Sequence, residues 1–136
     1  MIKNTLIICM LYFLSGCSQR NPVSTNDHVI ANGQMPNLIK DIDGSLQLVY
    51  GSGDSLMSAT SHEGGSSFSS PLLIDVITGL AASHTRGPQI AATKYGLTVI
   101  VCNSAGDIFS YNKPTSSSSW IKSGKVNDVD TVAKEN

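Results

Sequence analysis

Few residues of this chain have the types and spacing that site chemistry requires. The planar guanidinium of arginine makes paired, charge-assisted bonds to a carboxylate, and the chain has two arginines, Arg20 and Arg86. Arg86 is the candidate ligand-binding residue; the alternative is a loop arginine that is solvated or bonds to backbone. His62 and His84 have no partner at the spacing of metal ligands. No His-bearing motif adjoins Cys102, which we interpret as a small buried hydrophobe. These residues predict no metal site, no cofactor and no catalytic group in this chain.

Cys17 indicates a different chemistry, lipid attachment. Leu14-Ser15-Gly16-Cys17 matches the lipobox of bacterial lipoproteins, in which small residues precede a Cys that is diacylated and becomes the mature N-terminus. Before it, Lys3 supplies a positive charge, and residues 6–14 form an apolar core that is too short to span a bilayer. Residues 1–16 are therefore predicted to be a helical lipoprotein signal peptide. An ordinary secretory signal with an incidental Cys is the alternative.

Charge and the residues after Cys17 bound the location and the partners. Residues 17–35 are polar and turn-rich, and we expect a flexible tether there. Ser18 is not the acidic residue that commonly retains lipoproteins in an inner membrane, which favours the outer membrane of a bacterial cell envelope. The formal net charge of −1 and the 14% of charged residues argue against a nucleic-acid surface or a polybasic membrane face. The expected partner is a membrane, reached through the lipid, and not a nucleic acid.

The folded part is predicted to consist of short strands in two repeats. Ser, Thr, Asn and Gly are abundant and the apolar residues come in short runs, which favours strands and turns over helices. A shift of 52 residues (88 − 36) aligns Pro88 with Pro36 and Trp120 with Phe68. It also aligns apolar residues of the two halves, among them Val101 with Val49, Ile100 with Leu48 and Phe109 with Met57. A repeat of about fifty residues is typical of a propeller or a similar array. Each repeat, 36–83 and 88–136, is predicted to hold four strands, at 37–41, 45–50, 55–60 and 68–74, and at 89–94, 97–102, 107–112 and 120–126.

A Gly-Ser turn is predicted between the third and fourth strands of the first repeat. Its sequence is Ser61-His62-Glu63-Gly64-Gly65-Ser66-Ser67-Phe68. The two glycines allow positive φ, while Ser61 and Glu63 can bond to the amides of the turn. The spacing is that of the Asp box of bacterial neuraminidase repeats, Ser-x-Asp-x-Gly-x-Thr-Trp. Ser61, Gly65 and Ser67 fit it, whereas Glu63 replaces the Asp and Phe68 the Trp. A plain turn such as any β-protein contains is the alternative.

From about Pro36 onward, the chain resembles the sialidase (neuraminidase) superfamily of β-propellers, particularly bacterial exo-α-sialidase-like lipoproteins. The resemblance rests on 44–50 (Gly-Ser-Leu-Gln-Leu-Val-Tyr), on the Asp box and on 86–91 (Arg-Gly-Pro-Gln-Ile-Ala). It implies a six-bladed propeller with Asp boxes on the outer hairpins, far from the central site. We therefore expect an all-β fold in residues 36–136, with about two four-stranded antiparallel blades of an incomplete six-bladed β-propeller.

The resemblance also implies what the chain lacks. Sialidases hold the substrate carboxylate with three arginines and use an acidic acid/base and a Tyr-Glu nucleophile pair. Arg20 lies in the tether, so that only Arg86 is carried over, in an Arg-Gly-Pro sequence that resembles the family's Arg-Ile-Pro motif. We expect a lipid-anchored fragment of a sialidase-like propeller whose parent processes glycans such as sialosides, while this chain is inactive by itself. A non-enzymatic propeller module that binds glycan or protein is the alternative.

Length bounds the number of blades. Residues 36–136 suffice for two repeats of this period, whereas closed propellers have about four to eight blades. We expect the N-terminal portion of a longer protein, and a two-blade module that oligomerises is the alternative.

Overall fold

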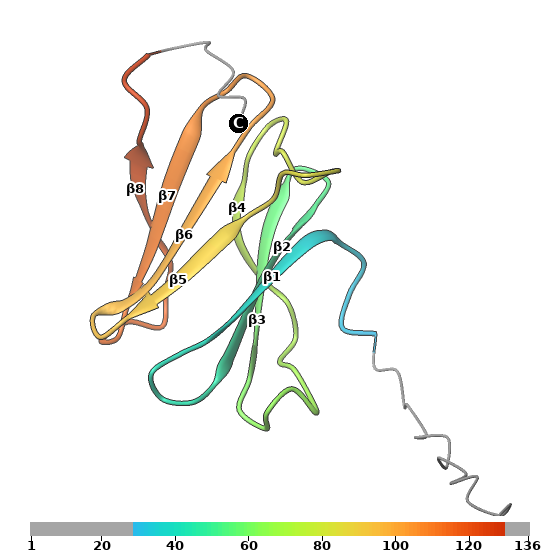
Figure 1. The fold of residues 1–136 in the computed structure, drawn as a ribbon, viewed down its shortest axis with the longest axis vertical. Helices are drawn as coiled ribbons and strands as arrows, with labels where there is room; N and C mark the ends of the chain where they lie inside the picture. Colours follow the sequence, from blue (N-terminus) through green and yellow to red (C-terminus); the bar gives the residue numbers. More distant parts are fainter. Residues whose placement is uncertain (1–28, 130–136) are drawn as a thin grey trace, which may run out of the picture.

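Eight strands in two antiparallel sheets form the regular structure of residues 29–129, the part of the chain that the computed structural model describes (Figure 1). The sheets have the orders β1-β2-β3-β4 and β5-β6-β7-β8, so that strands adjacent in the sequence are adjacent in each sheet. No helix occurs within these residues. The strands are β1 (Gln34–Lys40), β2 (Leu46–Ser52), β3 (Ser55–Ser61), β4 (Leu72–Val76), β5 (Gln89–Thr93), β6 (Gly96–Cys102), β7 (Ile108–Pro114) and β8 (Ile121–Lys125).

The all-β prediction and the four strands predicted for each repeat are confirmed. The largest difference in bounds is at β4, which begins at Leu72 and not at Phe68. Ser69 pairs with Thr60 partly through its hydroxyl, which accepts a bond from the Thr60 amide at 3.1 Å, and Pro71 has no N–H to donate. The regular ladder therefore starts only after Pro71. The predicted signal peptide and Cys17 lie outside the described residues.

The two sheets repeat each other, but not with one constant shift. Leu38 on β1 pairs with Leu48 on β2, and Ile90 on β5 pairs with Val99 on β6. A shift of 52 (90 − 38) between β1 and β5 therefore requires a shift of 51 (99 − 48) between β2 and β6. The shift returns to 52 (111 − 59) for β3 and β7, because Ala59 opposes Leu48 and Tyr111 opposes Val99.

The predicted alignment of Val101 with Val49 and of Ile100 with Leu48 is therefore wrong by one residue. Ile100 corresponds to Val49 (49 + 51), and Val101 corresponds to Tyr50 (50 + 51). The correction matters because a slip of one residue moves a side chain to the other face of a sheet.

The sheets pack face to face around one core. We call the side of the first sheet that carries Val49, Leu56 and Ser58 its back face, and the opposite side, with Leu38, Leu48 and Met57, its front face. By the shifts above, the front face of the second sheet carries Ile90, Val99, Phe109 and Tyr111, and its back face carries Ile100, Ile108 and Ser110. The back face of the first sheet meets the front face of the second. The buried cluster there consists of Val49, Leu56, Ile77, Leu80, Ala82, Val99, Val101 and Tyr111.

The strands β1 and β5 lie side by side at the inner edges of the sheets and run in the same direction (Figure 1). Asn37 on β1 donates a hydrogen bond to Gln89 on β5 at 2.9 Å, and these two residues are 52 positions apart. Two residues earlier in each repeat, Met35 approaches Gly87 so closely that a Cβ added to Gly87 would lie 2.3 Å from the Met35 Cβ. Residues at matching places of the two repeats therefore meet along this edge.

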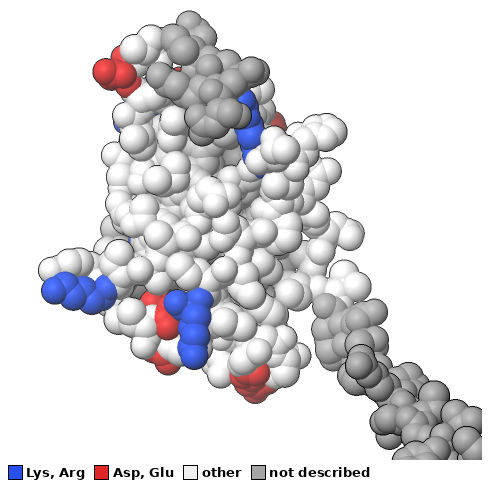
Figure 2. All heavy atoms as spheres, in the orientation of Figure 1, with Lys and Arg blue, Asp and Glu red and all other residues white. Residues whose placement is uncertain are grey.

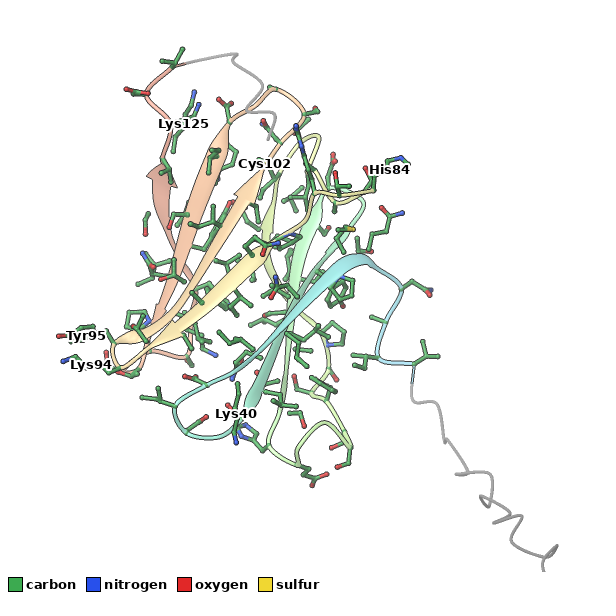
Figure 3. All side chains as sticks on the ribbon, viewed as in Figure 1. Lys40, His84, Lys94, Tyr95, Cys102 and Lys125 are labelled. Atoms are coloured by element: carbon green, nitrogen blue, oxygen red, sulfur yellow. The ribbon has the colours of Figure 1, made fainter. Side chains whose placement is uncertain are left out.

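On the face shown in Figure 2, charged side chains are sparse between the two ends of the molecule. In Figure 2, they gather near the hairpin turns, and the middle of the visible face is uncharged. Lys40, Lys94 and Tyr95 lie at the end that carries the β1–β2 and β5–β6 turns, whereas His84, Cys102 and Lys125 lie toward the other end (Figure 3).

Candidate functional site

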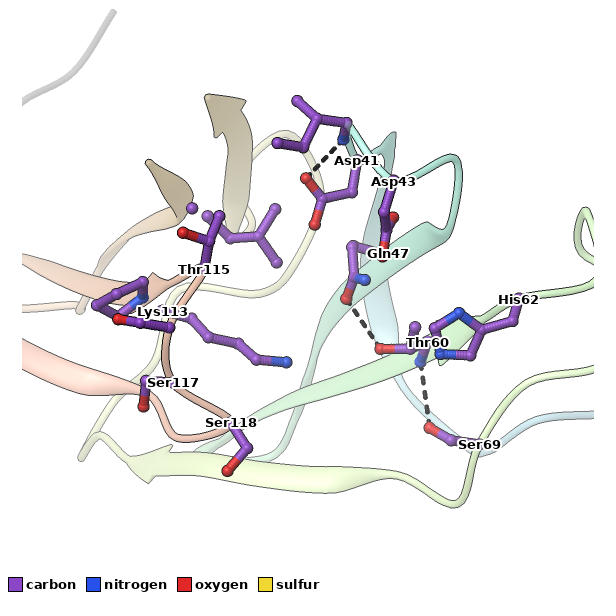
Figure 4. Close-up of a pocket in the computed structure, with 15 residues that line it drawn as sticks. Asp41, Asp43, Gln47, Thr60, His62, Ser69, Lys113, Thr115, Ser117 and Ser118 are labelled. Atoms are coloured by element: carbon purple, nitrogen blue, oxygen red, sulfur yellow. Dashed lines mark hydrogen bonds between the residues drawn. The ribbon is translucent and has the colours of Figure 1, made fainter. Parts of the chain in front are cut away.

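A polar groove of about 650 Å³ opens between the two sheets at the end that carries the β1–β2 and β5–β6 turns (Figure 4). One wall comes from the first sheet and its β1–β2 and β3–β4 turns. The other comes from the start of β6, the end of β7 and the β7–β8 turn. The polar side chains that line it are Asp41, Asp43, Gln47, Thr60, His62 and Ser69 on the first wall and Lys113, Thr115, Ser116, Ser117 and Ser118 on the second.

A hydrogen-bonded chain fixes the first wall. Gln47 is buried on β2, its Nε2 donates to the Ser45 hydroxyl at 2.9 Å, and its Oε1 accepts from the Thr60 hydroxyl at 2.8 Å. Asp43 accepts bonds from the Ser45 amide and hydroxyl at 2.9 and 2.6 Å. The hydroxyl bond from Ser45 is the main reason why the pKa of Asp43 lies below its ordinary value, and the nearby His62 adds to this effect. Asp43 is therefore a fixed anion and not a proton donor at neutral pH.

The second wall provides a cation. Lys113 on β7 extends its side chain into the groove, beside hydroxyls of the β7–β8 turn (Figure 4). Among the hydrogen bonds and ion pairs of residues 29–129, none involves the Lys113 ammonium or the His62 ring. Both groups are thus available to a ligand, next to the hydroxyls of Thr60, Ser69 and Thr115. Such a lining suits a polyhydroxylated or anionic ligand.

Arg86, the predicted ligand-binding residue, does not join this groove. It lies half-buried in the loop before β5, at the opposite end of that strand from Gly96, which borders the groove. Its amide donates to the Ser83 carbonyl at 3.1 Å, and within residues 29–129 its guanidinium has no hydrogen bond or ion pair. A shallow hollow of about 560 Å³ adjoins this end, bordered by Gln34, Asp54 and Ser83 among others. Arg86 itself is not part of its lining.

The turn at Ser61–Phe68 forms as predicted. The buried hydroxyl of Ser61 accepts bonds from the Gly65 amide at 2.9 Å and the Glu63 amide at 3.3 Å. Gly65 has a φ of +94°, which a residue with a side chain adopts only with strain. The Glu63 carboxylate bonds to the hydroxyl of Ser67 at 2.9 Å, and so to a side chain and not to an amide. Phe68 is half-buried just after the turn.

Sequence reasoning missed a polar link across the sheet interface. Asp75 on β4 accepts bonds from the Tyr111 hydroxyl at 2.7 Å and from Lys122 Nζ at 2.8 Å. Lys122 and Tyr111 hold the pKa of Asp75 below its ordinary value, and the bond to Asp75 raises the pKa of Lys122. Burial raises the pKa of Tyr111 to about 12, and Asp75 adds to this shift. A lone acid within the apolar run Leu72–Val76 was the sequence signal for this link.

No group of three or more His, Cys, Asp or Glu side chains in residues 29–129 is placed to hold a metal ion. The same residues contain no helix that could cross a membrane. A scan against protein-family models and a search of curated proteins found no match to the chain.

Proposed function

We propose that this chain is a lipid-anchored part of a sialidase-like propeller in a bacterial cell envelope, and that its two sheets are consecutive blades with no sialidase activity of their own. The observation that supports this proposal most is the inner edge, where Asn37 on β1 meets Gln89 on β5 at 2.9 Å. Innermost strands of neighbouring blades lie in this way around a propeller axis.

The absence of activity follows from the carboxylate clamp. Arg86 is the one arginine among residues 29–129, and its loop lies away from the polar groove. Removing a single well-placed donor from an active site costs about 2.7–4 kcal/mol of transition-state stabilisation, and here most of the clamp is missing. The chain should therefore release sialic acid from an α-linked fluorogenic sialoside no faster than buffer without protein does. Turnover that disappears in Arg86→Ala would show that the chain is a sialidase.

The lipid anchor has a separate test. Metabolic labelling with a palmitate analogue should mark the wild-type chain and not Cys17→Ser, because a serine hydroxyl does not replace the acylated thiol. Equal labelling of the two proteins would remove the anchor from the proposal and leave the propeller part intact.

A second function, glycan binding without hydrolysis, is favoured by the polar groove. Lys113 can bind a carboxylate, while Gln47, Thr60 and the serines of the β7–β8 turn can bind sugar hydroxyls. In titration calorimetry with sialyllactose, Lys113→Ala should weaken binding about 10- to 100-fold, which corresponds to the loss of one charge-assisted hydrogen bond.

Two comparisons make this test specific. Lys94→Ala is the matched control, because Lys94 lies over the Tyr95 ring at 5.0 Å and does not line the groove. Lactose, which lacks the carboxylate, should bind wild type and Lys113→Ala equally. Equal sialyllactose affinities for all three proteins would exclude the groove as the binding site.

A further inference from the structure

The outward back face of the second sheet repeats the buried back face of the first. Ile100 stands at the place of Val49, Ile108 at that of Leu56, and Ser110 at that of Ser58. Each face also has one polar pair at the same register position. Thr60 donates to Gln47 at 2.8 Å on the first sheet, and Thr98 donates to Asn112 at 2.7 Å on the second. The surface on which the second sheet packs is therefore present again, facing outward.

The front face of the first sheet is likewise a copy of the face that the second sheet buries. Leu38, Leu48 and Met57 stand at the places of Ile90, Val99 and Phe109. Leu38 remains 53% exposed and Leu73, on the same face, 50%. Residues 29–33, which precede β1, correspond to 81–85 by the 52-residue shift, and part of that second segment fills the interface between the sheets. The first sheet thus presents a complete front face with no sheet upon it in the described chain.

Neither outward face carries a counterpart of the link between Asp75, Tyr111 and Lys122. Tyr111 corresponds to Ala59 (111 − 52) on the first sheet. Asp75 corresponds to Val126 (75 + 51) on the second sheet, because Val126 lies opposite Ile108 and Asp75 lies opposite Leu56. If the pairing of Met57 with Leu73 and of Ser58 with Leu72 is extended by one residue, Ala59 lies opposite Pro71. Pro71 therefore corresponds to Lys122, which lies opposite Tyr111 on the second sheet. Burial of the two outward faces against each other would therefore leave no acid and no hydrogen-bond donor of this link buried without its partner.

We propose that the front face of the first sheet binds the back face of the second sheet of another copy of this chain, head to tail, in continuation of the interface between its own two sheets. A second copy fits because each chain carries both halves of that interface in outward positions, and matching apolar faces pack better than faces of unrelated shape. The proposed contact between copies differs from the interface between the two sheets at one position. In that interface Ala82 packs closely against Gly51. The back face of the second sheet has Cys102 at the place of Gly51, so the two faces must lie farther apart there to accommodate the thiol.

Two face variants test this arrangement in the full-length chain, in one non-ionic detergent throughout. Leu38→Arg places a charge on the front face and Ile100→Arg on the back face, at residues that are 53% and 45% exposed and so tolerate the change. Ile42→Arg is the matched control, because Ile42 is 65% exposed in the β1–β2 turn and on neither face. Far-UV circular dichroism confirms that each variant is folded.

Mass is then measured by light scattering after size-exclusion chromatography. Wild type and Ile42→Arg should form assemblies of more than one copy, and Leu38→Arg and Ile100→Arg should each be monomers. An equimolar mixture of the two monomeric variants should give a dimer and nothing larger, since each supplies the face that the other has lost. A monomeric wild type, assemblies that persist in either face variant, or a mixture without dimers would each overturn the proposal. The result does not depend on glycan binding or on lipid attachment.

Discussion

At the residue scale, Asp75 makes the principal polar link between the two sheets. Its carboxylate lies 2.7 Å from the Tyr111 hydroxyl, which is on a side chain only 1% exposed, and 2.8 Å from Lys122 Nζ. Asp75→Asn keeps the shape of the side chain and removes its charge. Hydrogen bonds to charged groups contribute about 1.5–3 kcal/mol, and solvent screening of the partly exposed Asp75–Lys122 pair reduces this value. We expect the free energy of unfolding in urea to fall by about 1–2 kcal/mol.

The same carboxylate makes the stability of the fold depend on pH, and the stability should fall in acid. Lys122 and Tyr111 lower the folded-state pKa of Asp75 below the ordinary value of 3.8. Its contribution is therefore present above that value and is lost as the pH falls through the folded-state pKa. The urea midpoints of wild type and Asp75→Asn should differ at pH 7 and converge toward about pH 2. Asp128→Asn, at an exposed carboxylate beyond β8, is the control and should leave the urea midpoint unchanged at both pH values. A difference for Asp75→Asn that is constant down to that pH would contradict the assignment.

At the element scale, the β5–β6 hairpin depends on a glycine at its second strand. Gly96 has a φ of +137°, and a Cβ there would lie 2.2 Å from the Lys113 carbonyl oxygen and 2.8 Å from the Pro114 Cα. Because both neighbours are backbone atoms of β7, the strand pair itself must shift. Gly96→Ala should cost about 2–6 kcal/mol, with backbone strain and overpacking each contributing about 1–3 kcal/mol.

Gly53→Ala separates the two causes. Gly53 has a φ of +57° in the β2–β3 turn, but nothing lies within 4 Å of its added Cβ. This variant should lose only about 1–2 kcal/mol, the cost of the left-handed conformation. Equal losses for Gly53→Ala and Gly96→Ala in urea unfolding would mean that the close approach to β7 is unimportant.

At the scale of the whole molecule, the two sheets share one core and should unfold as one unit. Leu56 on β3 is fully buried in the cluster that also contains Val99 and Tyr111 of the second sheet. Leu56→Ala should cost about 2–5 kcal/mol, and hydrogen exchange should quicken at the amides of both β2 and β6. Leu72→Ala, at a residue that is 51% exposed, is the control with a small effect. Faster exchange in β2 alone would show that the sheets unfold independently.

Local sequence determined the strands and turns of this protein. The glycines at turns such as Gly53 and Gly65 depend on φ and on contacts between near neighbours, so they could be predicted from short windows of sequence. The Ser61 turn was predictable for the same reason, since its hydroxyl accepts bonds from amides only two and four residues ahead. The start of β4 was misplaced because the pairing of Ser69 with Thr60 involves a side chain.

The tertiary structure alone decided how the sheets face each other and where polar groups gather. A shift of 52 is correct for β1 and β3, but 51 applies to β2, and this single residue decides whether the counterpart of Leu48 is the buried Val99 or the exposed Ile100. Asp75 and Tyr111 are 36 positions apart, and the groove gathers Gln47 and Lys113 from different sheets. Such contacts depend on how one sheet stacks on the other, which no local pattern encodes, because the energy of stacking is summed over both faces at once.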